Sequence, residues 1–274
     1  MKTMRNMQSF VSVKALARKA AAVCLAAAVC VTGLPVTQLH AEGLQEEKST
    51  KAVEEKPVLE LGFEESLADT SEKNTQIKAM KVNNNVSEET TELNYVEGRN
   101  GGKALSFDGK TYLDLGKDGS LSPEKLTLSL WIKPNVEISS EQAIAWNKVA
   151  WNQDGWYLNL ATNTGAIVLC TGGGRQVCVK GTAKELFPVG EWTHLAVTYD
   201  SSTKKGLIYL NGIQQATVSD TAGSGVISPC PTVQKSIGWN GEQYKTPSLN
   251  AALDEYRLYD KALSAQSVID IYKQ

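Results

Sequence analysis

The 274-residue chain carries 28 lysine and arginine residues against 30 aspartate and glutamate residues. The first 41 residues hold five of the basic residues and none of the acidic ones, which leaves 23 basic against 30 acidic side chains in the remainder. A net acidic chain argues against nucleic acid or an anionic membrane surface as the partner. His194 is the single histidine after residue 41, which excludes a site with several histidine ligands.

The N-terminal segment has the composition of a secretory leader. Basic residues between Lys2 and Lys19 precede an Ala/Val/Leu-rich run from Ala20 to Leu34, and a short polar run ends at Ala41. This order predicts a signal peptide over residues 1–41. Because the apolar run is shorter than the ~20 residues that span a bilayer, we expect a secreted, extracellular protein with no membrane span.

Two further segments follow the leader. Residues 42–56 are polar and charged with almost nothing to bury, which predicts a flexible linker. Residues 57–274 fit one all-β domain, since sandwiches commonly reach this length without dividing. The chain either acts alone after export or forms the front part of a longer product in an extracellular assembly.

Within the domain, short strands alternate with turn signals. The clearest is 126–133, where Leu126, Leu128, Leu130 and Ile132 alternate with polar residues or tryptophan, the period of a strand. In chain order the pattern predicts strands at 58–63, 103–107, 111–115, 126–133, 143–147, 155–161, 166–170, 176–179, 192–199, 207–210, 213–218, 233–238 and 251–259.

Turns and one helix complete this pattern. Asp108-Gly109 and Asn211-Gly212 are typical of tight hairpins. Ser264 is suited to cap a helix over 265–272, with Val268, Ile269 and Tyr272 on one face. The stretch 64–98 is less regular, and its polar run over 83–92 is expected to be a surface loop. Many short strands and one terminal helix predict a jelly-roll β-sandwich of two antiparallel sheets.

Six spaced motifs resemble a known family. They are Leu61-Gly-Phe-Glu-Glu-Ser-Leu-Ala-Asp-Thr-Ser71, Gly102-Lys-Ala-Leu-Ser-Phe-Asp-Gly109, Leu128-Ser-Leu-Trp-Ile-Lys-Pro134, Gly190-Glu-Trp-Thr-His-Leu-Ala-Val-Thr-Tyr-Asp200, Ile208-Tyr-Leu-Asn-Gly212 and Leu253-Asp-Glu-Tyr-Arg-Leu-Tyr-Asp-Lys-Ala-Leu-Ser264. Their order and spacing are similar to laminin-G-like domains of the concanavalin A-like lectin/glucanase superfamily. The resemblance implies that sandwich fold from about Pro57 to the end. It does not choose among lectins, binding modules, adhesion domains and glycosidases.

The sequence argues against catalysis. A glucanase on this scaffold needs carboxylates that alternate along one strand, and none of the predicted strands carries such a run. Asp254 and Glu255 are adjacent and would point to opposite faces of a regular strand. His194 lies within a predicted strand, where the resemblance implies a structural role. We therefore expect a non-catalytic domain.

Three cysteines follow the leader. Cys170 and Cys178 flank a glycine-rich hairpin turn, and opposite positions on a hairpin can bring two sulfurs within bonding distance. This predicts a Cys170–Cys178 disulfide, with two free, buried thiols as the alternative. The state of Cys230, between two prolines, is left open.

The resemblance also implies a structural calcium ion that ties the first strand to the last. The matching residues are Glu64, Asp69 and Asp254, whose oxygens are the ligand type that calcium prefers. The alternative is that these carboxylates cap turns or face solvent.

Two clusters combine aromatic and planar polar side chains as a glycan site requires. One surrounds Trp146 and Trp151, and the other follows Trp239. Trp151 and Trp239 lie at turn-rich positions where exposure is expected, although they could instead cover the ends of the sandwich. Trp131, Trp156 and Trp192 lie in strand patterns and are expected in the core. The predicted ligand-binding residues are Trp146, Trp151, Gln153, Arg175, Trp239, Asn240 and Tyr244.

These observations favour a secreted, lectin-like module whose partner is a glycan or glycoprotein. A protein-binding adhesion domain is the second hypothesis, in which the aromatic residues would form a flat patch rather than a groove. An atypical glycoside hydrolase is the third, and it would require two facing carboxylates about 5–10 Å apart.

Overall fold

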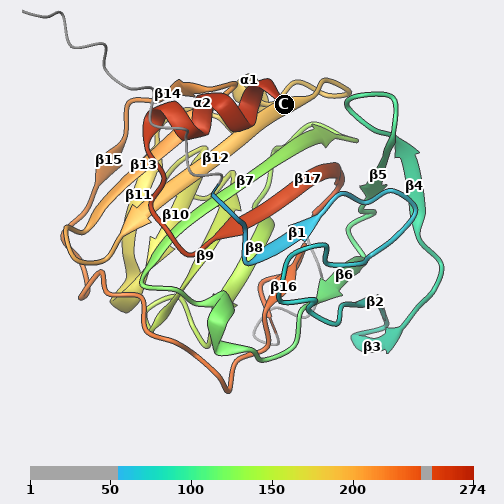
Figure 1. Ribbon diagram of the computed structural model, residues 1–274, viewed down its shortest axis with the longest axis horizontal. Coiled ribbons are helices and arrows are strands. Elements are labelled where there is room, and N and C mark those ends of the chain that lie inside the picture. The colour runs from blue at the N-terminus through green and yellow to red at the C-terminus, as the bar shows by residue number, and fades with distance from the viewer. Residues whose placement is uncertain (1–54, 242–248) are drawn as a thin grey trace, which may run out of the picture. The chain divides into compact units, whose positions relative to one another are not determined.

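The computed structural model describes residues 55–241 and 249–274, which fold into a sandwich of two antiparallel sheets (Figure 1). Within these ranges the eight-stranded sheet has the order β14-β13-β12-β7-β17-β5-β4, with β1 beside β17. Its strands are β1 (Leu59–Leu61), β4 (Asn94–Glu97), β5 (Lys103–Ser106), β7 (Lys125–Pro134), β12 (Thr193–Asp200), β13 (Lys205–Leu210), β14 (Ile213–Gln214) and β17 (Ala251–Tyr259).

The nine-stranded sheet, counted over the same ranges, has the order β15-β11-β10-β9-β8-β16-β6-β2-β3. Its strands are β2 (Lys78–Asn83), β3 (Val86–Glu89), β6 (Thr111–Asp114), β8 (Gln142–Lys148), β9 (Gly155–Leu160), β10 (Ile167–Thr171), β11 (Arg175–Val179), β15 (Val218–Ser219) and β16 (Ser236–Ile237). The predicted all-β jelly-roll sandwich is therefore confirmed.

Strand β7 shows how the sequence pattern forms the core. It pairs with β12 on one side and β17 on the other, so it is central in its sheet. Leu126, Leu128, Leu130 and Ile132 are all fully buried between the sheets, as their alternation predicts. The residues between them lie on the outer face of the sheet.

The predicted Asn211-Gly212 hairpin is confirmed, whereas the predicted Asp108-Gly109 hairpin was wrong, because this turn joins β5 to β6, which belong to different sheets. Asn211 and Gly212 both have positive φ, 49° and 74°, which the tight turn between β13 and β14 requires. At the turn before β6, Asp108 Oδ1 accepts the backbone N–H groups of Lys110 and Thr111 at 2.9 and 2.8 Å. The glycine-rich run joins β10 to β11, with Thr171 opposite Arg175.

Two strand predictions were wrong. The expected surface loop over 83–92 contains β3, and the less regular stretch 64–98 also contains β2 and β4. Strands β3 and β4 lie at sheet edges, and every residue of β3 is exposed, so no buried face left an alternating pattern in the sequence. The predicted strand 213–218 instead divides into β14 and β15, which belong to different sheets.

Helices cover little of the sandwich. The helices of the described ranges are α1 (Ala183–Leu186), α2 (Ala265–Lys273) and two short 3-10 turns, η1 (Gly119–Leu121) and η2 (Gly172–Gly174). Ser264 caps α2 by accepting the N–H of Ser267 at 3.1 Å, as predicted. Val268 and Ile271 of α2 pack on Tyr209 and Tyr259, so this helix covers the outer face of the eight-stranded sheet. None of the helices in these ranges has the length and apolar composition needed to cross a bilayer.

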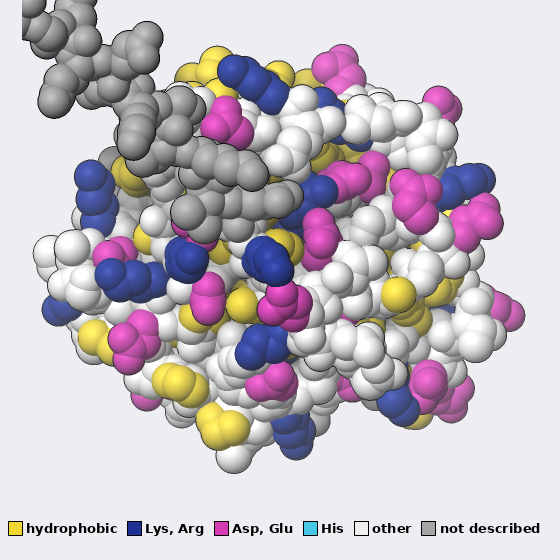
Figure 2. Space-filling view, in the orientation of Figure 1, with side chains coloured by type: hydrophobic (Ala, Val, Ile, Leu, Met, Phe, Trp, Pro, Cys, Tyr) yellow, Lys and Arg dark blue, Asp and Glu magenta, His cyan; other side chains and the backbone are white. Residues whose placement is uncertain are grey.

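Figure 2 shows the face of the molecule on which α2 lies. Lysine and arginine side chains alternate with aspartate and glutamate over this face, and the hydrophobic side chains form only small, separate groups (Figure 2). The visible part of this face therefore presents neither a broad apolar patch nor a field of charge of one sign.

Candidate functional site

The outer face of the nine-stranded sheet carries a row of aromatic side chains. Antiparallel register places Trp146 of β8 between Ser236 of β16 and Tyr157 of β9. The rings of Trp146 and Tyr157 stack, with centroids 4.9 Å apart and an interplanar angle of 15°. Trp146 Nε1 donates to the backbone carbonyl of Lys148 at 2.6 Å, which restrains the indole.

A second aromatic pair lies across β16 from the first. Trp239 follows β16 and packs on Tyr112 of β6, with ring centroids 4.4 Å apart, and Val82 of β2 completes the cluster. Ser236 Oγ donates to the backbone carbonyl of Trp239 at 2.7 Å, which holds the segment after β16 against the sheet. The two pairs therefore stand on one sheet face.

Three hollows connect along this face. The central hollow, about 330 Å³, is lined by Lys117, Trp146, Lys148, Val149, Thr232, Val233, Gln234, Ser236, Trp239 and Gly241. The strand hollow, about 390 Å³, shares Gln234 and Trp239 with it and extends over Met80, Val82 and Tyr112. The loop hollow, about 400 Å³, shares Val149, Thr232 and Val233 and extends to Gln153, Asp154 and the segment 229–231. We call the three together the groove.

Two buried lysines stabilise the groove from behind. Lys148 is 1% exposed, and its ammonium donates to the carbonyl of Thr171 at 2.8 Å. Lys235, also 1% exposed, donates to the carbonyls of Cys230 and Val233 at 2.6 and 2.9 Å, which fixes the segment that separates the central and loop hollows. Burial lowers the pKa of both lysines, although the charges of nearby groups partly oppose it.

An amide cluster lies beside Trp239. Glu141 Oε1 accepts from Asn159 Nδ2 at 2.7 Å and from Asn240 Nδ2 at 3.0 Å. The side-chain carbonyl oxygens of both asparagines are buried without a hydrogen-bond partner. A buried carbonyl oxygen without a donor costs about 1–3 kcal/mol, so this cluster has unused capacity to accept hydrogen bonds.

The structure brings together part of the predicted glycan-binding set. Trp146 and Trp239 line the groove, Gln153 lines its loop hollow, and Asn240 belongs to the adjacent amide cluster. Trp239 is 6% exposed, which differs from the exposure that its turn-rich sequence predicts, because it packs on Tyr112.

The other predicted residues lie apart. Trp151 is 52% exposed and rests on Gly174, and it does not line any of the three hollows. Arg175 lies near Gly225 and Tyr199 rather than in the groove. Tyr244 lies outside the described residues. Lys148 and Tyr157 also lie on this face but were not among the predicted ligand-binding residues, because their sequence signal is alternation with core residues along β8 and β9.

The predicted Cys170–Cys178 disulfide is not formed, and Cys170, Cys178 and Cys230 are free and buried. Register pairs Cys178 with Val168 and Cys170 with Gln176, so the two cysteines are diagonal rather than opposite. Diagonal Cα atoms lie about 7–8 Å apart, whereas bridged cysteines need about 4.4–6.8 Å. Burial raises the pKa of the Cys170 thiol, as expected for a buried structural cysteine.

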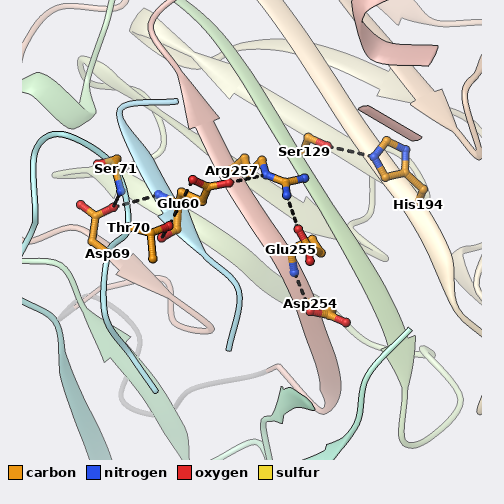
Figure 3. A network of polar contacts seen from close by, with 9 residues as sticks. All are labelled: Glu60, Asp69, Thr70, Ser71, Ser129, His194, Asp254, Glu255 and Arg257. Carbon is orange, nitrogen blue, oxygen red and sulfur yellow. Dashed lines mark hydrogen bonds and ion pairs between the residues drawn. The ribbon is translucent and has the colours of Figure 1, made fainter. Parts of the chain in front are cut away.

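A serine–histidine pair lies on the opposite side of the sandwich. Ser129 Oγ and His194 Nε2 are 2.9 Å apart, but each residue is only 1% exposed (Figure 3). His194 Nδ1 is buried without a partner, and burial together with the charges of Arg99 and Arg257 lowers the pKa of His194 to about 4. A general base needs an orienting partner and access to substrate, so this pair is structural.

Polar contacts beside this pair join the first strand to the last (Figure 3). Arg257 of β17 donates from Nε to Glu60 of β1 at 2.8 Å and from Nη2 to Glu255. Glu255 has φ of 50° and lies at a bulge in β17. These carboxylates are bound to an arginine that is mostly buried, which is a structural arrangement rather than an acid–base pair.

The predicted calcium ligands are not all brought together. Asp69 accepts the N–H groups of Glu60, Ser71 and Thr75 at 3.0, 2.9 and 2.7 Å. Burial alone would raise the pKa of Asp69, but these hydrogen bonds outweigh it and hold the pKa below its ordinary value. Asp69 therefore caps a turn, and no group of three acidic, histidine or cysteine side chains in the described residues could hold a metal ion.

Glu64 and Asp254 do approach a common turn. Glu64 Oε2 accepts the N–H of Lys103 at 2.9 Å, and Asp254 Oδ2 accepts that of Arg99 at 2.9 Å. A Cβ on Gly102 would come within 2.2 Å of Glu64, and one on Gly98 within 2.9 Å of Asp254. Burial raises the pKa of Asp254, and the charges of Glu255 and Glu64 add to this. The charges of Glu64 and Asp254 therefore act on each other, whereas Asp69 caps a separate turn.

Comparisons with known proteins support the fold. Domain 4 of AbnA, a GH43 extracellular arabinanase from Geobacillus stearothermophilus solved in complex with arabinotriose, has a TM-score of 0.59 and 23% identity. That comparison covers 80% of this chain and 98% of the domain. The binding domain of Paraclostridial Mosquitocidal Protein 1 has a TM-score of 0.53 and 18% identity, covering 79% and 52% of the two chains. A structure of botulinum neurotoxin type C, whose cell entry depends on two ganglioside molecules, has a TM-score of 0.54 and 14% identity, covering 80% and 51%.

One curated protein and one family model match the sequence itself. Mouse (Mus musculus) pappalysin-1 is 29% identical in an alignment 140 residues long, which covers 46% of this chain and only 8% of that protein. The Laminin_G_3 model, described as the concanavalin A-like lectin/glucanases superfamily, matches residues 107–269, more than half of the chain. The chain therefore belongs to the Laminin_G_3 family of the concanavalin A-like lectin/glucanases superfamily.

Proposed function

We propose that residues 57–274 form a secreted, non-catalytic recognition module that binds carbohydrate in the groove. The observation that carries this proposal is the placement of Trp146 and Trp239 in one hollow together with Lys117, Gln234 and Ser236. Small-ligand sites are typically concave and aromatic, with a few polar groups that orient the ligand. The apolar faces of a pyranose ring suit the indoles, and its hydroxyl groups suit the polar residues.

The amide cluster supports the same proposal. Asn240 follows Trp239 directly in the chain, and its side-chain oxygen is buried without a donor. Sugar hydroxyl groups are hydrogen-bond donors that could satisfy such an oxygen, and the gain is largest where the acceptor is already desolvated. The arabinotriose complex of the similar arabinanase domain is a further point in favour.

The groove argues against the alternative of a glycoside hydrolase. Among the described residues that line it, Asp154 is the single carboxylate, and it lies at one end in the loop hollow. Glycoside hydrolysis requires two carboxyl groups that flank the scissile bond. The proposal therefore assigns recognition rather than cleavage.

A glycan array probed with the purified chain tests this function. We expect selective binding that weakens at least tenfold in Trp239→Leu and remains unchanged in Trp192→Leu. Trp192 provides the matched control, because it is only half-buried and lies outside the groove under Lys133. Circular dichroism would establish that both variants are folded. A blank array with well-folded protein would contradict carbohydrate binding and favour the protein-adhesion hypothesis.

Export is part of the proposal and has its own test. The leader composition of residues 1–41 predicts that the full chain, expressed with its own N-terminus, appears in the culture medium. N-terminal sequencing of that product should begin at Glu42. Retention of an uncleaved chain inside the cell would contradict secretion.

We also propose a structural calcium ion held by Glu64 and Asp254. Two carboxylates that approach one turn raise the free energy of the fold unless a cation or proton compensates them. Calcium accepts carboxylate and backbone carbonyl oxygens together, and both are present at this turn. Asp69 is left out of this proposed site, since its oxygens accept three backbone N–H groups, whereas Asp254 accepts two and Glu64 accepts one.

A further inference from the structure

The central hollow is the basic part of the groove. Lys117 and Lys148 are the ionisable side chains among its described lining residues, and Lys235 lies directly behind the segment 230–233 that forms one side of it. None of these three lysines takes part in an ion pair within the described ranges. The lining of the hollow therefore carries lysines that no ion pair among the described residues neutralises, although the charges of Asp118 and Asp154 act on Lys235 and Lys148 from outside it.

The carboxylates near these lysines are otherwise engaged or lie elsewhere. Asp114 Oδ1 accepts the N–H of Gly116 at 2.7 Å, and Asp118 Oδ1 accepts that of Ser120 at 2.8 Å. Asp154 acts on Lys148 through its charge, but its side chain lines the loop hollow. Charge along the groove thus changes from neutral in the strand hollow, to basic in the centre, to acidic at the loop end.

The two lysines of the central hollow differ in how they can act. Lys117 is exposed at the rim, so its ammonium can contact a ligand directly. Lys148 is buried and bound to the carbonyl of Thr171, so it acts mainly through its field. A charge in a low-dielectric setting interacts more strongly with an incoming anion than the same charge in water.

The groove is also longer than a single sugar needs. The strand hollow stands over β2 and β6, and the central hollow over β16 and β8. Neighbouring strands are about 4.8 Å apart, so these four strands alone span roughly 14 Å, and the loop hollow extends beyond them. Shared lining residues make the path continuous, which suits a linear chain rather than a terminal residue.

We propose that the groove binds an internal segment of a linear glycan in which a carboxylate-bearing sugar occupies the central hollow between uncharged neighbours. This rests on the proposed carbohydrate-binding function and narrows it to one substrate class. The carboxylate would approach Lys117 above the indoles of Trp146 and Trp239. Acidic sugars at every position would fit less well, because Asp154 repels a second carboxylate in the loop hollow.

Calorimetric titration with hyaluronan oligosaccharides, in which acidic and uncharged sugars alternate, tests the proposal. We expect the hexasaccharide to bind at least tenfold more tightly than its carboxyl-reduced form, more tightly than the disaccharide, and more tightly than a galacturonate hexasaccharide. The preference for the charged hexasaccharide over its carboxyl-reduced form should decrease with added salt, because salt screens the attraction between the carboxylate and the lysines.

Two variants assign the preference to the lysines. Lys117→Gln and Lys148→Met should each bring the affinity for the hexasaccharide towards that of its reduced form, whereas Lys184→Met should behave as the natural protein. Lys184 is the control because it is exposed and outside the groove. Lys117 is exposed, so its variant remains informative even if Lys148→Met unfolds.

The outcomes separate this inference from the function on which it depends. Equal binding of the charged and reduced chains would overturn the acidic-sugar inference and leave carbohydrate binding intact. An array that shows only uncharged sugars or terminal sugars as ligands would likewise overturn the acidic-sugar inference and leave carbohydrate binding intact. A folded protein that binds no glycan at all would overturn both.

Discussion

The two outer faces of the sandwich differ in how they are covered. On the eight-stranded sheet, α2 places Val268 and Ile271 over Tyr209 and Tyr259, and the polar residues beside it are bound to Arg257 or to backbone groups. On the nine-stranded sheet, the rings of Trp146 and Trp239 line hollows that the described residues do not fill.

This comparison separates residues that stabilise the fold from residues available to a ligand. Both faces contain aromatic rings, charged groups and a buried titratable side chain, so residue type alone does not distinguish them. The serine–histidine pair has the residue types of a catalytic site but no access, whereas the exposed Lys117 lines a hollow. Access, rather than chemistry, identifies the functional face.

The largest expected effect is the pH dependence that His194, on the eight-stranded sheet, gives to the free energy of unfolding. Its pKa of about 4 lies below the ordinary 6.5, so the unfolded chain binds the proton more tightly. The stabilisation from a neutral His194 is therefore present above pH 6.5 and is lost as the pH falls towards 4, about 3 kcal/mol in all. Denaturant unfolding at a series of pH values should show a flatter profile for His194→Gln. The raised pKa of Asp254 changes stability with pH in the opposite direction. Because Asp254 is present in both proteins, its contribution cancels when the two pH profiles are compared. An unchanged profile would contradict the structural assignment.

Uncovering the eight-stranded sheet should cost stability without affecting recognition. Ile271→Ala removes buried methyl groups from the contact between α2 and the sheet, and we expect a loss of about 2 kcal/mol in the free energy of unfolding. Glycan affinity should not change, since the groove is on the other sheet. The control is Ile213→Ala, because Ile213 is 67% exposed. A parallel loss of affinity in Ile271→Ala would show that the two faces are coupled.

The proposed calcium ion predicts a smaller gain. At a calcium concentration ten times its Kd, binding to the folded state should stabilise the protein by about 1.4 kcal/mol, and chelator should reverse this. Thermal unfolding with and without calcium measures it. Asp254→Asn should abolish the calcium effect, whereas Asp69→Asn should lower stability but retain it. The absence of any response in the natural protein would refute the site.

The smallest expected effect concerns Trp151. Because its ring is 52% exposed and lies apart from the hollows, Trp151→Ala should change stability by less than about 0.5 kcal/mol and glycan affinity by less than twofold. Calorimetric titration beside Trp239→Leu gives the comparison. A loss in Trp151→Ala as large as in Trp239→Leu would move the binding surface to the loop around Gly174.

Local sequence signals explain why the fold was largely predictable and the site only partly so. Asn211-Gly212 specifies its turn, and the leucines of β7 specify a buried face, because both depend on near neighbours. Trp146, Trp239 and Asn240 were predicted from composition around turns. Trp151 and Arg175 have the same composition, yet they lie outside the groove, since their loops pack on Gly174 and near Gly225.

The sequence by itself determined the sandwich, the main hairpins and the capped terminal helix, because strand alternation, turn residues and capping act over a few neighbouring positions. Only the tertiary structure decided which sheet face remains open, that Cys170 and Cys178 are diagonal, and that Lys117, Lys148 and Lys235 surround one hollow. Those properties depend on register and on contacts between distant strands such as β6, β8 and β16. A shift of one residue in register would move strand residues such as Cys170 and Lys148 to the opposite face.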